Sequence, residues 1–256
     1  MKIEILGCSG GMGLGLHTTC LRINQHLLID AGSGLGQLRQ EELLAIRHIL
    51  ITHAHLDHLC FLPLLIDNLF EHLERPIEVY ALPEVIQVMQ EHIFNWKVWP
   101  DFSTLPTPEH PVVRFHPLTP AQPLVIEQLQ ITPFLVEHTV PTCGYHLVSE
   151  QGRSFAFTGD TTFTERLITH LNQLGPLDVL MTECAFPNRM QDLAHASRHL
   201  TPALLDQLLV ELAHPPQQVW LSHLKPSQTA EISSEIQQLN SPSQLHLLRS
   251  GEQFSL

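Results

Sequence analysis

The sequence predicts an α/β protein, because segments with strand periodicity and segments with helical periodicity alternate in both halves of the chain. The chain is also long enough for a sizeable core, with 256 residues of which 43% are hydrophobic. Polar residues suited to chemistry follow directly after several apolar strands. We therefore expect one compact domain, residues 1–256, with its functional groups at strand ends.

In the first half, strand segments precede a helix. Residues 2–6 alternate apolar and polar side chains, and residues 20–32 have the pattern of a two-stranded hairpin. Residues 47–52 form an apolar strand that runs directly into a histidine-rich motif, and residues 82–94 have helical spacing. The motif therefore begins where a strand ends.

In the second half, strands again alternate with a helix. The eight prolines between Pro100 and Pro133 exclude helices there, so we expect extended loops and edge strands. The same rules of periodicity predict strands at residues 129–139, 143–149, 153–160, 177–183 and 217–223, and an amphipathic helix at residues 201–214.

Charge and composition exclude several classes of protein. Thirteen basic against 26 acidic residues leave a net charge of −13, which argues against a broad grip on a nucleic-acid backbone. Residues 1–11 lack the apolar stretch of a signal peptide, and no window is apolar enough to cross a bilayer. The five cysteines are dispersed and never form Cys-x-x-Cys, so we expect no disulfide framework, no cysteine-based zinc site and a reduced, cytoplasmic setting.

The segment THAHLDHL, residues 52–59, concentrates three histidines and an aspartate. On an extended chain, residues two apart point the same way, so His53 and His55 can share one metal ion while Asp57 and His58 reach a neighbouring one. Residue frequencies give such a cluster roughly a few chances in a thousand of arising by accident, so we interpret it as a metal site. Thr52 and Leu56 then serve as spacers.

Two metal ions need more ligands, and later strand ends supply them. His138, Asp160 and His223 each lie at the carboxyl end of an apolar strand. A lone histidine after a strand is more often a cap or a surface residue, but the shared position of these three favours ligation.

With these residues the chain resembles the metallo-β-lactamase superfamily over nearly its whole length. The resemblance implies a four-layer αββα sandwich with a binuclear site at one edge, and a buried aspartate, here Asp30, that steadies the first ligand loop. Two divalent ions are implied, with zinc first and manganese or iron as alternatives. By similarity, His53, His55 and His138 would hold one ion, Asp57, His58 and His223 the other, and Asp160 would bridge them.

The ligand set favours hydrolysis. His55 stands where the flavodiiron branch of the superfamily has a glutamate, which argues against an oxygen-reducing site. Two metal ions about 3.5–4 Å apart lower the pKa of a shared water and clamp the attacking and leaving oxygens. Phosphodiesters, thioesters and lactones are all accessible to that chemistry.

A later pair of residues favours phosphodiesters among these substrates. Glu183 ends a strand and His199 precedes a helix, a pattern similar to ribonuclease Z and related phosphodiesterases, in which a glutamate orients a histidine near the phosphate. A ribose oxygen leaves poorly unless it is protonated, and His199 backed by Glu183 could donate that proton. Asp57, Glu183 and His199 are therefore the predicted catalytic residues. The alternatives are that Thr201 caps the helix and leaves His199 merely exposed, or that His195 has the role.

The overall resemblance is to bacterial class II 3',5'-cyclic-nucleotide phosphodiesterases, and it is carried by LGCSGG, IFNWKVWPDF, ECAFPN and HLKP. It implies hydrolysis of a cAMP-like 3',5'-cyclic nucleotide to the 5'-monophosphate by a metal-bridging hydroxide. A small-molecule phosphodiester would then be the substrate and a homodimer the assembly. Phe61, Pro63 and Ile66 depart from the class II signature, which leaves the substrate open.

Three other functions stay open. Ribonuclease Z-like 3' processing of transfer RNA fits the Glu183 and His199 pattern but conflicts with the net charge and the missing basic arm. A thioesterase or lactonase would share the metal ligands and would have no need of His199. A non-catalytic metal-binding or nucleotide-sensing module would leave unexplained why all seven expected ligands are present.

Three further features allow more than one interpretation. Residues 7–15 are rich in glycine but lack the ending of a P-loop, so we expect a flexible loop at the border of the site, or a core turn. The aromatic residues within 94–102 could pack a lid onto the core, stack a base or form a dimer contact. Lys225 could meet a phosphate oxygen or be solvated.

Overall fold

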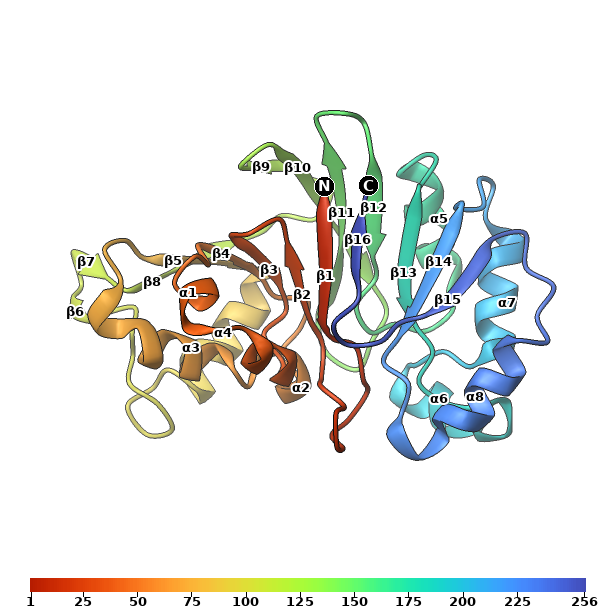
Figure 1. Ribbon diagram of the computed structural model, residues 1–256, viewed down its shortest axis with the longest axis horizontal. Coiled ribbons are helices and arrows are strands. Elements are labelled where there is room, and N and C mark those ends of the chain that lie inside the picture. The colour runs from red at the N-terminus through yellow and green to blue at the C-terminus, as the bar shows by residue number, and fades with distance from the viewer.

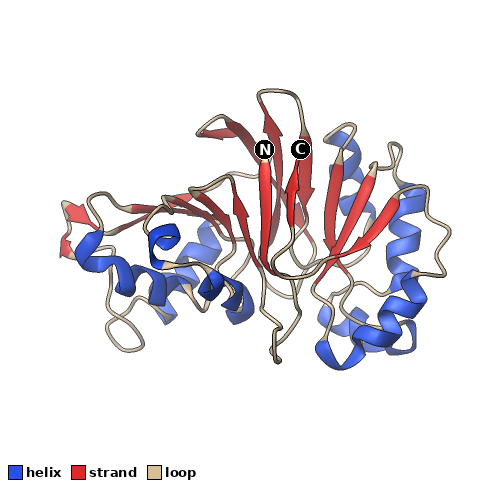
Figure 2. Cartoon of the chain, viewed as in Figure 1, coloured by secondary structure: helices blue, strands red, loops and turns tan.

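The computed structural model describes all 256 residues and contains two seven-stranded sheets packed face to face. Helices cover the outer face of each sheet, so the layers run helix, sheet, sheet, helix (Figure 1). Figure 2 shows the strands in the middle of the molecule and the helices in two groups on its flanks. The predicted α/β class and four-layer αββα sandwich are confirmed.

The first sheet has the strand order β16-β1-β2-β3-β4-β5-β8. Its first strands pair antiparallel with one another and with β16, whereas β3, β4, β5 and β8 run parallel. The bounds are β1 (Lys2–Gly7), β2 (Cys20–Ile23), β3 (Leu27–Ile29), β4 (His48–Leu50), β5 (Ile77–Ala81), β8 (Val113–Pro117) and β16 (Gln253–Ser255).

The second sheet has the order β15-β14-β13-β12-β11-β10-β9. It is antiparallel from β9 to β12 and parallel from β12 to β15. The bounds are β9 (Leu124–Ile126), β10 (Leu129–Val136), β11 (Thr142–Ser149), β12 (Ser154–Phe157), β13 (Val179–Glu183), β14 (Gln218–Ser222) and β15 (Gln244–Leu247); β6 (Pro106–Thr107) and β7 (His110–Pro111) form a separate two-stranded ribbon.

The helices divide between the two outer faces in chain order (Figure 1). The first group is α1 (Gln40–Leu43), α2 (Leu56–Leu59), α3 (Leu62–Leu69) and α4 (Pro83–His92), and the second is α5 (Glu165–Gln173), α6 (Gln191–Ser197), α7 (Pro202–Glu211) and α8 (Thr229–Ile236). Short 3-10 turns lie at η1 (Ser33–Gln37), η2 (Phe70–His72), η3 (Asn188–Met190) and η4 (Pro226–Gln228).

Local sequence explains where these elements begin and what they bury. The hydroxyl of Thr164 accepts a hydrogen bond from the backbone of Leu167 at the start of α5, and Thr201 caps α7 in the same way before Pro202. Every residue of β12 and β13 is buried, as expected for strands covered on both faces. One apolar cluster fills the space between the sheets and extends under α3 and α4, and a second lies beneath α5, α7 and α8.

The proline-rich stretch is confirmed as extended chain. It contains no helix, and its strands β8 and β9 lie at the edges of the two sheets. Six helices and three strands had no counterpart in the prediction: α1, α2, α3, α5, α6, α8, β5, β15 and β16. No helix has the length and apolar character needed to traverse a bilayer. That residues 1–256 fold as a single domain stays a prediction.

Candidate active site

The predicted site residues gather at one end of the sandwich, where the carboxyl ends of five strands meet. The histidine motif follows β4, His138 follows β10, Asp160 follows β12, Glu183 ends β13 and His223 follows β14. Both α2, which carries the end of the motif, and α6, which precedes His199, lie at the lower edge of the view in Figure 1. Strands of both sheets therefore deliver side chains to the same place.

The seven predicted ligands form two sets, and within each set the oxygen and nitrogen atoms are close enough together to bind one metal ion. The ligand atoms of His53, His55, His138 and Asp160 lie within 4.8 Å of one another, and so do those of Asp57, His58 and His223. These two sets agree with the division expected from the resemblance. Their assignment as ligands remains a prediction.

Asp160 lies between the two sets. Its Oδ2 is 3.8 Å from His53 Nε2 and 3.3 Å from His223 Nε2, while its Oδ1 is 3.4 Å from His58 Nε2. A carboxylate within 4 Å of imidazoles from both sets has the position that a bridging ligand requires.

The donor set fits two divalent ions. His53 Nε2 and His58 Nε2 are buried and have no hydrogen-bond partner in the protein, although buried polar atoms are normally paired. His138 Nε2 also points into the cluster, 3.3 Å from His55 Nδ1 and 3.9 Å from Asp160 Oδ2. Imidazole nitrogens and carboxylate oxygens that converge without partners are the ligands that zinc, manganese and iron accept.

Burial keeps most of these imidazoles in the neutral form that binds metal. It lowers the pKa of His53, and it lowers the pKa of His138 to about 4 and that of His223 to about 3. His58 differs, because Asp160 and Asp30 outweigh the effect of burial and raise its pKa.

Asp30 orients two of the candidate ligands at once. Its Oδ2 accepts a hydrogen bond from His58 Nδ1 at 2.7 Å, which directs His58 Nε2 toward the metal position. The Thr52 hydroxyl donates to Asp30 and lies 3.0 Å from His53 Nδ1, from which it can accept. The interpretation of Thr52 as a spacer was therefore wrong. Asp30 and His223 both have backbone φ in the left-handed region, at 59° and 60°.

Glu183 and His199 form a buried pair beside the cluster. His199 Nδ1 donates to Glu183 Oε1 at 2.5 Å, and the ligand atoms of His199, Asp160 and His223 lie within 4.8 Å of one another. Burial opposes protonation of His199, but the charge and hydrogen bond of Glu183 prevail and raise its pKa. Glu183 is itself fixed by the backbone N–H of Thr161 at 2.9 Å.

The structure decides between the alternatives considered for His199. Thr201 does cap α7, but His199 is only 7% exposed, so the interpretation of an exposed histidine was wrong. His195 is exposed on α6 and contacts Gln191 rather than the cluster.

The remaining sequence features have mixed outcomes. The glycine-rich loop borders the site, because the backbone N–H of His223 donates to Cys8 and Gly10 lies against His223. Lys225 is half-buried, its Nζ donates to the Gly10 carbonyl at 2.9 Å, and it lies 3.3 Å from His223 Nε2, so it is not simply solvated.

The aromatic stretch divides between core and surface. Phe94 and Phe102 are buried in the core, whereas Trp96 is 64% exposed. Packing onto the core thus accounts for the two phenylalanines and leaves Trp96 unexplained.

A cavity of about 620 Å³ adjoins the site on the side of His138. Its wall includes Thr139, Arg166 and Arg198 together with apolar residues of the α4 start and of β10. Its volume is within the range of pockets that hold small molecules.

Comparison with known proteins identifies relatives for most of the chain. Residues 25–238 match the family described as "Beta-lactamase superfamily domain". A protein of Yersinia pestis named "Probable 3',5'-cyclic-nucleotide phosphodiesterase" is 28% identical, over 88% of this chain and 78% of that protein. The ribonuclease Z of Pyrococcus abyssi is 32% identical, over 51% of this chain and 41% of that protein.

Among solved structures, unliganded yeast PDE1 superposes with a TM-score of 0.84. The superposition covers 100% of this chain and 99% of that one at 19% sequence identity. At that identity the likeness concerns the fold.

Proposed function

We propose that this chain, which belongs to the beta-lactamase superfamily and is a metal-dependent hydrolase, opens the phosphodiester ring of a 3',5'-cyclic nucleotide. The product would be the 5'-monophosphate, and two zinc ions would be held by the seven clustered ligands. Manganese and iron suit the same donors.

The observation that carries the proposal is the Glu183 and His199 pair. Hydrolysis of a phosphodiester expels an alkoxide, which is a poor leaving group unless it takes up a proton. Glu183 holds His199 Nδ1 at 2.5 Å and leaves the second ring nitrogen free, and a ring nitrogen of His199 lies within 4.8 Å of ligand atoms of Asp160 and His223. A thioester would not call for this acid, because a thiolate leaves without taking up a proton.

Each part of the chain has a defined task in this proposal. Bound divalent ions supply Lewis acidity and a water that is acidic enough to attack near neutral pH. Asp30 and Thr52 keep His58 and His53 turned toward the metal positions. His199 keeps a proton on Nε2 for the departing ribose oxygen, and Glu183 stabilises the charge of that imidazolium.

The relatives support the choice of a cyclic nucleotide over other phosphodiesters. The Yersinia protein, whose name specifies 3',5'-cyclic nucleotides, matches 88% of this chain, whereas ribonuclease Z matches 51%. The net charge of −13 also opposes binding of a transfer RNA. A small-molecule substrate and a cytoplasmic, dimeric protein belong to the same proposal.

The proposal predicts that His199→Ala lowers the rate of cAMP hydrolysis by about a hundredfold or more, because the leaving oxygen then departs unprotonated. The same variant should keep most of its activity on bis-p-nitrophenyl phosphate, since nitrophenolate leaves without a proton. Rates of the zinc-loaded enzyme on both substrates measure this contrast. His195→Ala, which changes an exposed histidine nearby, is the control and should retain wild-type rates.

Three results would contradict the proposal. Zinc-loaded wild-type protein that opens no cyclic nucleotide would exclude this substrate, and cleavage of precursor transfer RNA in the same screen would favour the ribonuclease Z alternative. Turnover of a thioester that survives His199→Ala, without any phosphodiester activity, would favour a thioesterase.

A further inference from the structure

Arg198 has a backbone conformation that its residue type disfavours. It ends α6 with φ 54° and ψ 53°, in the left-handed region where glycine is the usual residue. A side chain with a Cβ is strained in that conformation, so the chain carries a cost that glycine would avoid. The contacts of the Arg198 side chain give a reason for its presence.

Arg198 holds residue 138 at two points. Its Nη1 donates to the His138 carbonyl at 2.7 Å and also to Glu137, and its own carbonyl accepts a hydrogen bond from His138 Nδ1 at 3.1 Å. The second contact places the proton on Nδ1 and leaves the Nε2 lone pair free to face the cluster. Side chain and backbone of one residue thus fix both the position and the tautomer of a candidate ligand.

The same residue is joined to the catalytic pair. His199 follows Arg198 directly, its ring centroid lies 5.0 Å from that of His138, and its backbone N–H donates to Ala194 at 2.8 Å. A displacement of residue 198 would therefore move His138 and His199 together.

We propose that Arg198 is a positioning residue that fixes His138 toward one metal ion and sets its distance from His199. The inference rests on the proposed function only in requiring a metal ion at His138; it does not depend on which substrate is hydrolysed. The positioning depends on the guanidinium and not only on the left-handed turn, because the hydrogen bond to the His138 carbonyl comes from the Arg198 side chain.

The test is zinc affinity, measured for each of the two ions by competition with a chromophoric chelator. Arg198→Met should weaken one of the two ions by about tenfold and leave the other unchanged, because the backbone of His138 loses the guanidinium that fixes it while the contact of its ring with the residue 198 carbonyl remains. Arg198→Gly should weaken the same ion equally, although its metal-free form should melt about 2 °C higher than that of Arg198→Met, because glycine relieves the strain. Arg198→Lys should be intermediate, since an ammonium can reach a carbonyl but lacks the planar fork.

Arg166→Met is the matched control. Arg166 lines the same cavity and is exposed, and its side chain makes no hydrogen bond or ion pair within the protein, so zinc affinity should not change. Zinc affinity of Arg198→Met equal to that of Arg166→Met would overturn the proposal. Wild-type affinity in Arg198→Gly would also overturn it, because the turn alone would then suffice.

The outcomes separate this inference from the proposed function. A protein that binds two zinc ions with the expected pattern but opens no cyclic nucleotide would contradict the function and uphold the role of Arg198. A wild-type protein that binds no zinc would overturn both.

Discussion

Individual histidines are kept neutral by burial in this protein, and one of them lies outside the metal cluster. His146 of β11 is 8% exposed, its ring nitrogen lies 2.8 Å from the Ser154 hydroxyl, and burial lowers its pKa to about 4. In the unfolded chain a histidine has a pKa near 6.5. Below that pH the imidazole of residue 146 is therefore protonated in the unfolded state but stays neutral in the folded state.

The direction in which pH changes the stability follows from this difference in pKa between the folded and unfolded states. The contribution of neutral His146 to stability is complete above about pH 6.5 and is lost as the pH falls toward about 4. When the pH falls from 7 to 4.5, the free energy of unfolding should decrease by about 2–3 kcal/mol more in the wild type than in His146→Leu. Urea unfolding across that range, with chelator present throughout, measures it.

The control for this prediction is His214→Leu, which alters an exposed histidine and should keep the wild-type pH dependence. An unchanged slope in His146→Leu would mean that His146 does not resist protonation in the folded protein.

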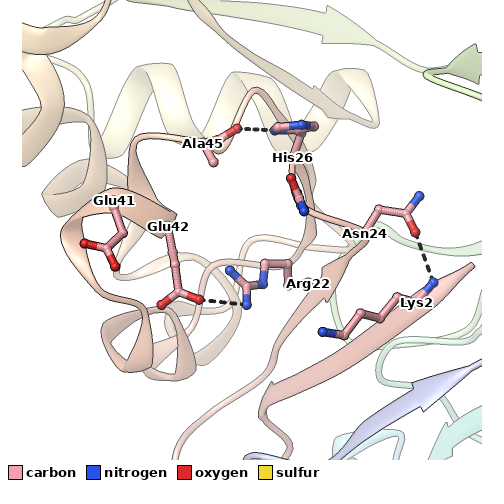
Figure 3. A pocket seen from close by; sticks show the side chains of 8 residues that line it. Lys2, Arg22, Asn24, His26, Glu41, Glu42 and Ala45 are labelled. Atoms are coloured by element: carbon pink, nitrogen blue, oxygen red, sulfur yellow. Dashed lines mark hydrogen bonds and ion pairs between the residues drawn. The ribbon is translucent and has the colours of Figure 1, made fainter.

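At the scale of elements, an ion-pair network holds α1 against the first sheet. Arg22 of β2 pairs with Glu4 of β1 and with Glu42 of α1, the latter at 3.0 Å, and its side chain is only 12% exposed. Figure 3 shows Arg22 and Glu42 at a polar hollow, whose volume is about 540 Å³. The guanidinium charge of Arg22 is balanced by Glu4 and Glu42, so the charged residues at the hollow have a structural explanation.

Arg22→Met should therefore lower the free energy of unfolding by about 1–3 kcal/mol, because Glu4 loses its ion-pair partner and Glu42 keeps only the exposed Arg39, while both carboxylates remain largely shielded from water. Chemical denaturation measures this value. Arg39→Met removes the exposed pairs of Arg39 with Glu41 and Glu42 and should leave stability unchanged. Equal stability of the two variants would contradict the role given to Arg22.

Sequence periodicity predicted elements where the pattern was long enough to read. The strands ending at Ser222 and Glu183 and the helix after Thr201 were predicted correctly, because buried strands and capped amphipathic helices have local signals. β16 has three residues and owes its existence to pairing with β1, some 250 positions earlier in the chain, so no local pattern could reveal it.

The same distinction applies to the site. Residue type, position at strand ends and the family resemblance predicted which side chains would meet, and the structure brings all seven together with His199. The roles of Thr52 and Arg198 could not be predicted, because they depend on a histidine tautomer and on a left-handed turn. Neither property has a signature in the sequence.

At the scale of the whole molecule, the candidate metal ligands come from both halves of the sandwich. His53, His55, Asp57 and His58 follow a strand of the first sheet, and His138, Asp160 and His223 follow strands of the second. Bound ions would thus cross-link the two sheets at one edge. Ligands that bind only the folded state stabilise it by mass action.

Chelation should consequently lower the melting temperature. Zinc at 100 times its dissociation constant contributes about 2.7 kcal/mol, which corresponds to a shift of roughly 5–10 °C for a chain of this size. Differential scanning calorimetry with chelator and after return of zinc measures the shift and its reversal. A melting temperature that is the same with and without zinc would contradict a metal site shared between the two sheets.

The left-handed backbone at Asp30, Arg198 and His223 has a consequence for how this chain can change. Three of its seven non-glycine residues with positive φ lie at the candidate site. Asp30 and His223 have other contributions to the fold, because Asp30 makes buried hydrogen bonds and His223 is a candidate metal ligand. In the metal-free protein, selection for heat resistance alone would favour glycine or asparagine at residue 198, since both adopt that conformation with less strain. A variant enriched in this way would be more stable without metal and would bind the ion at His138 less tightly, so thermostability and metal binding favour different residues at position 198.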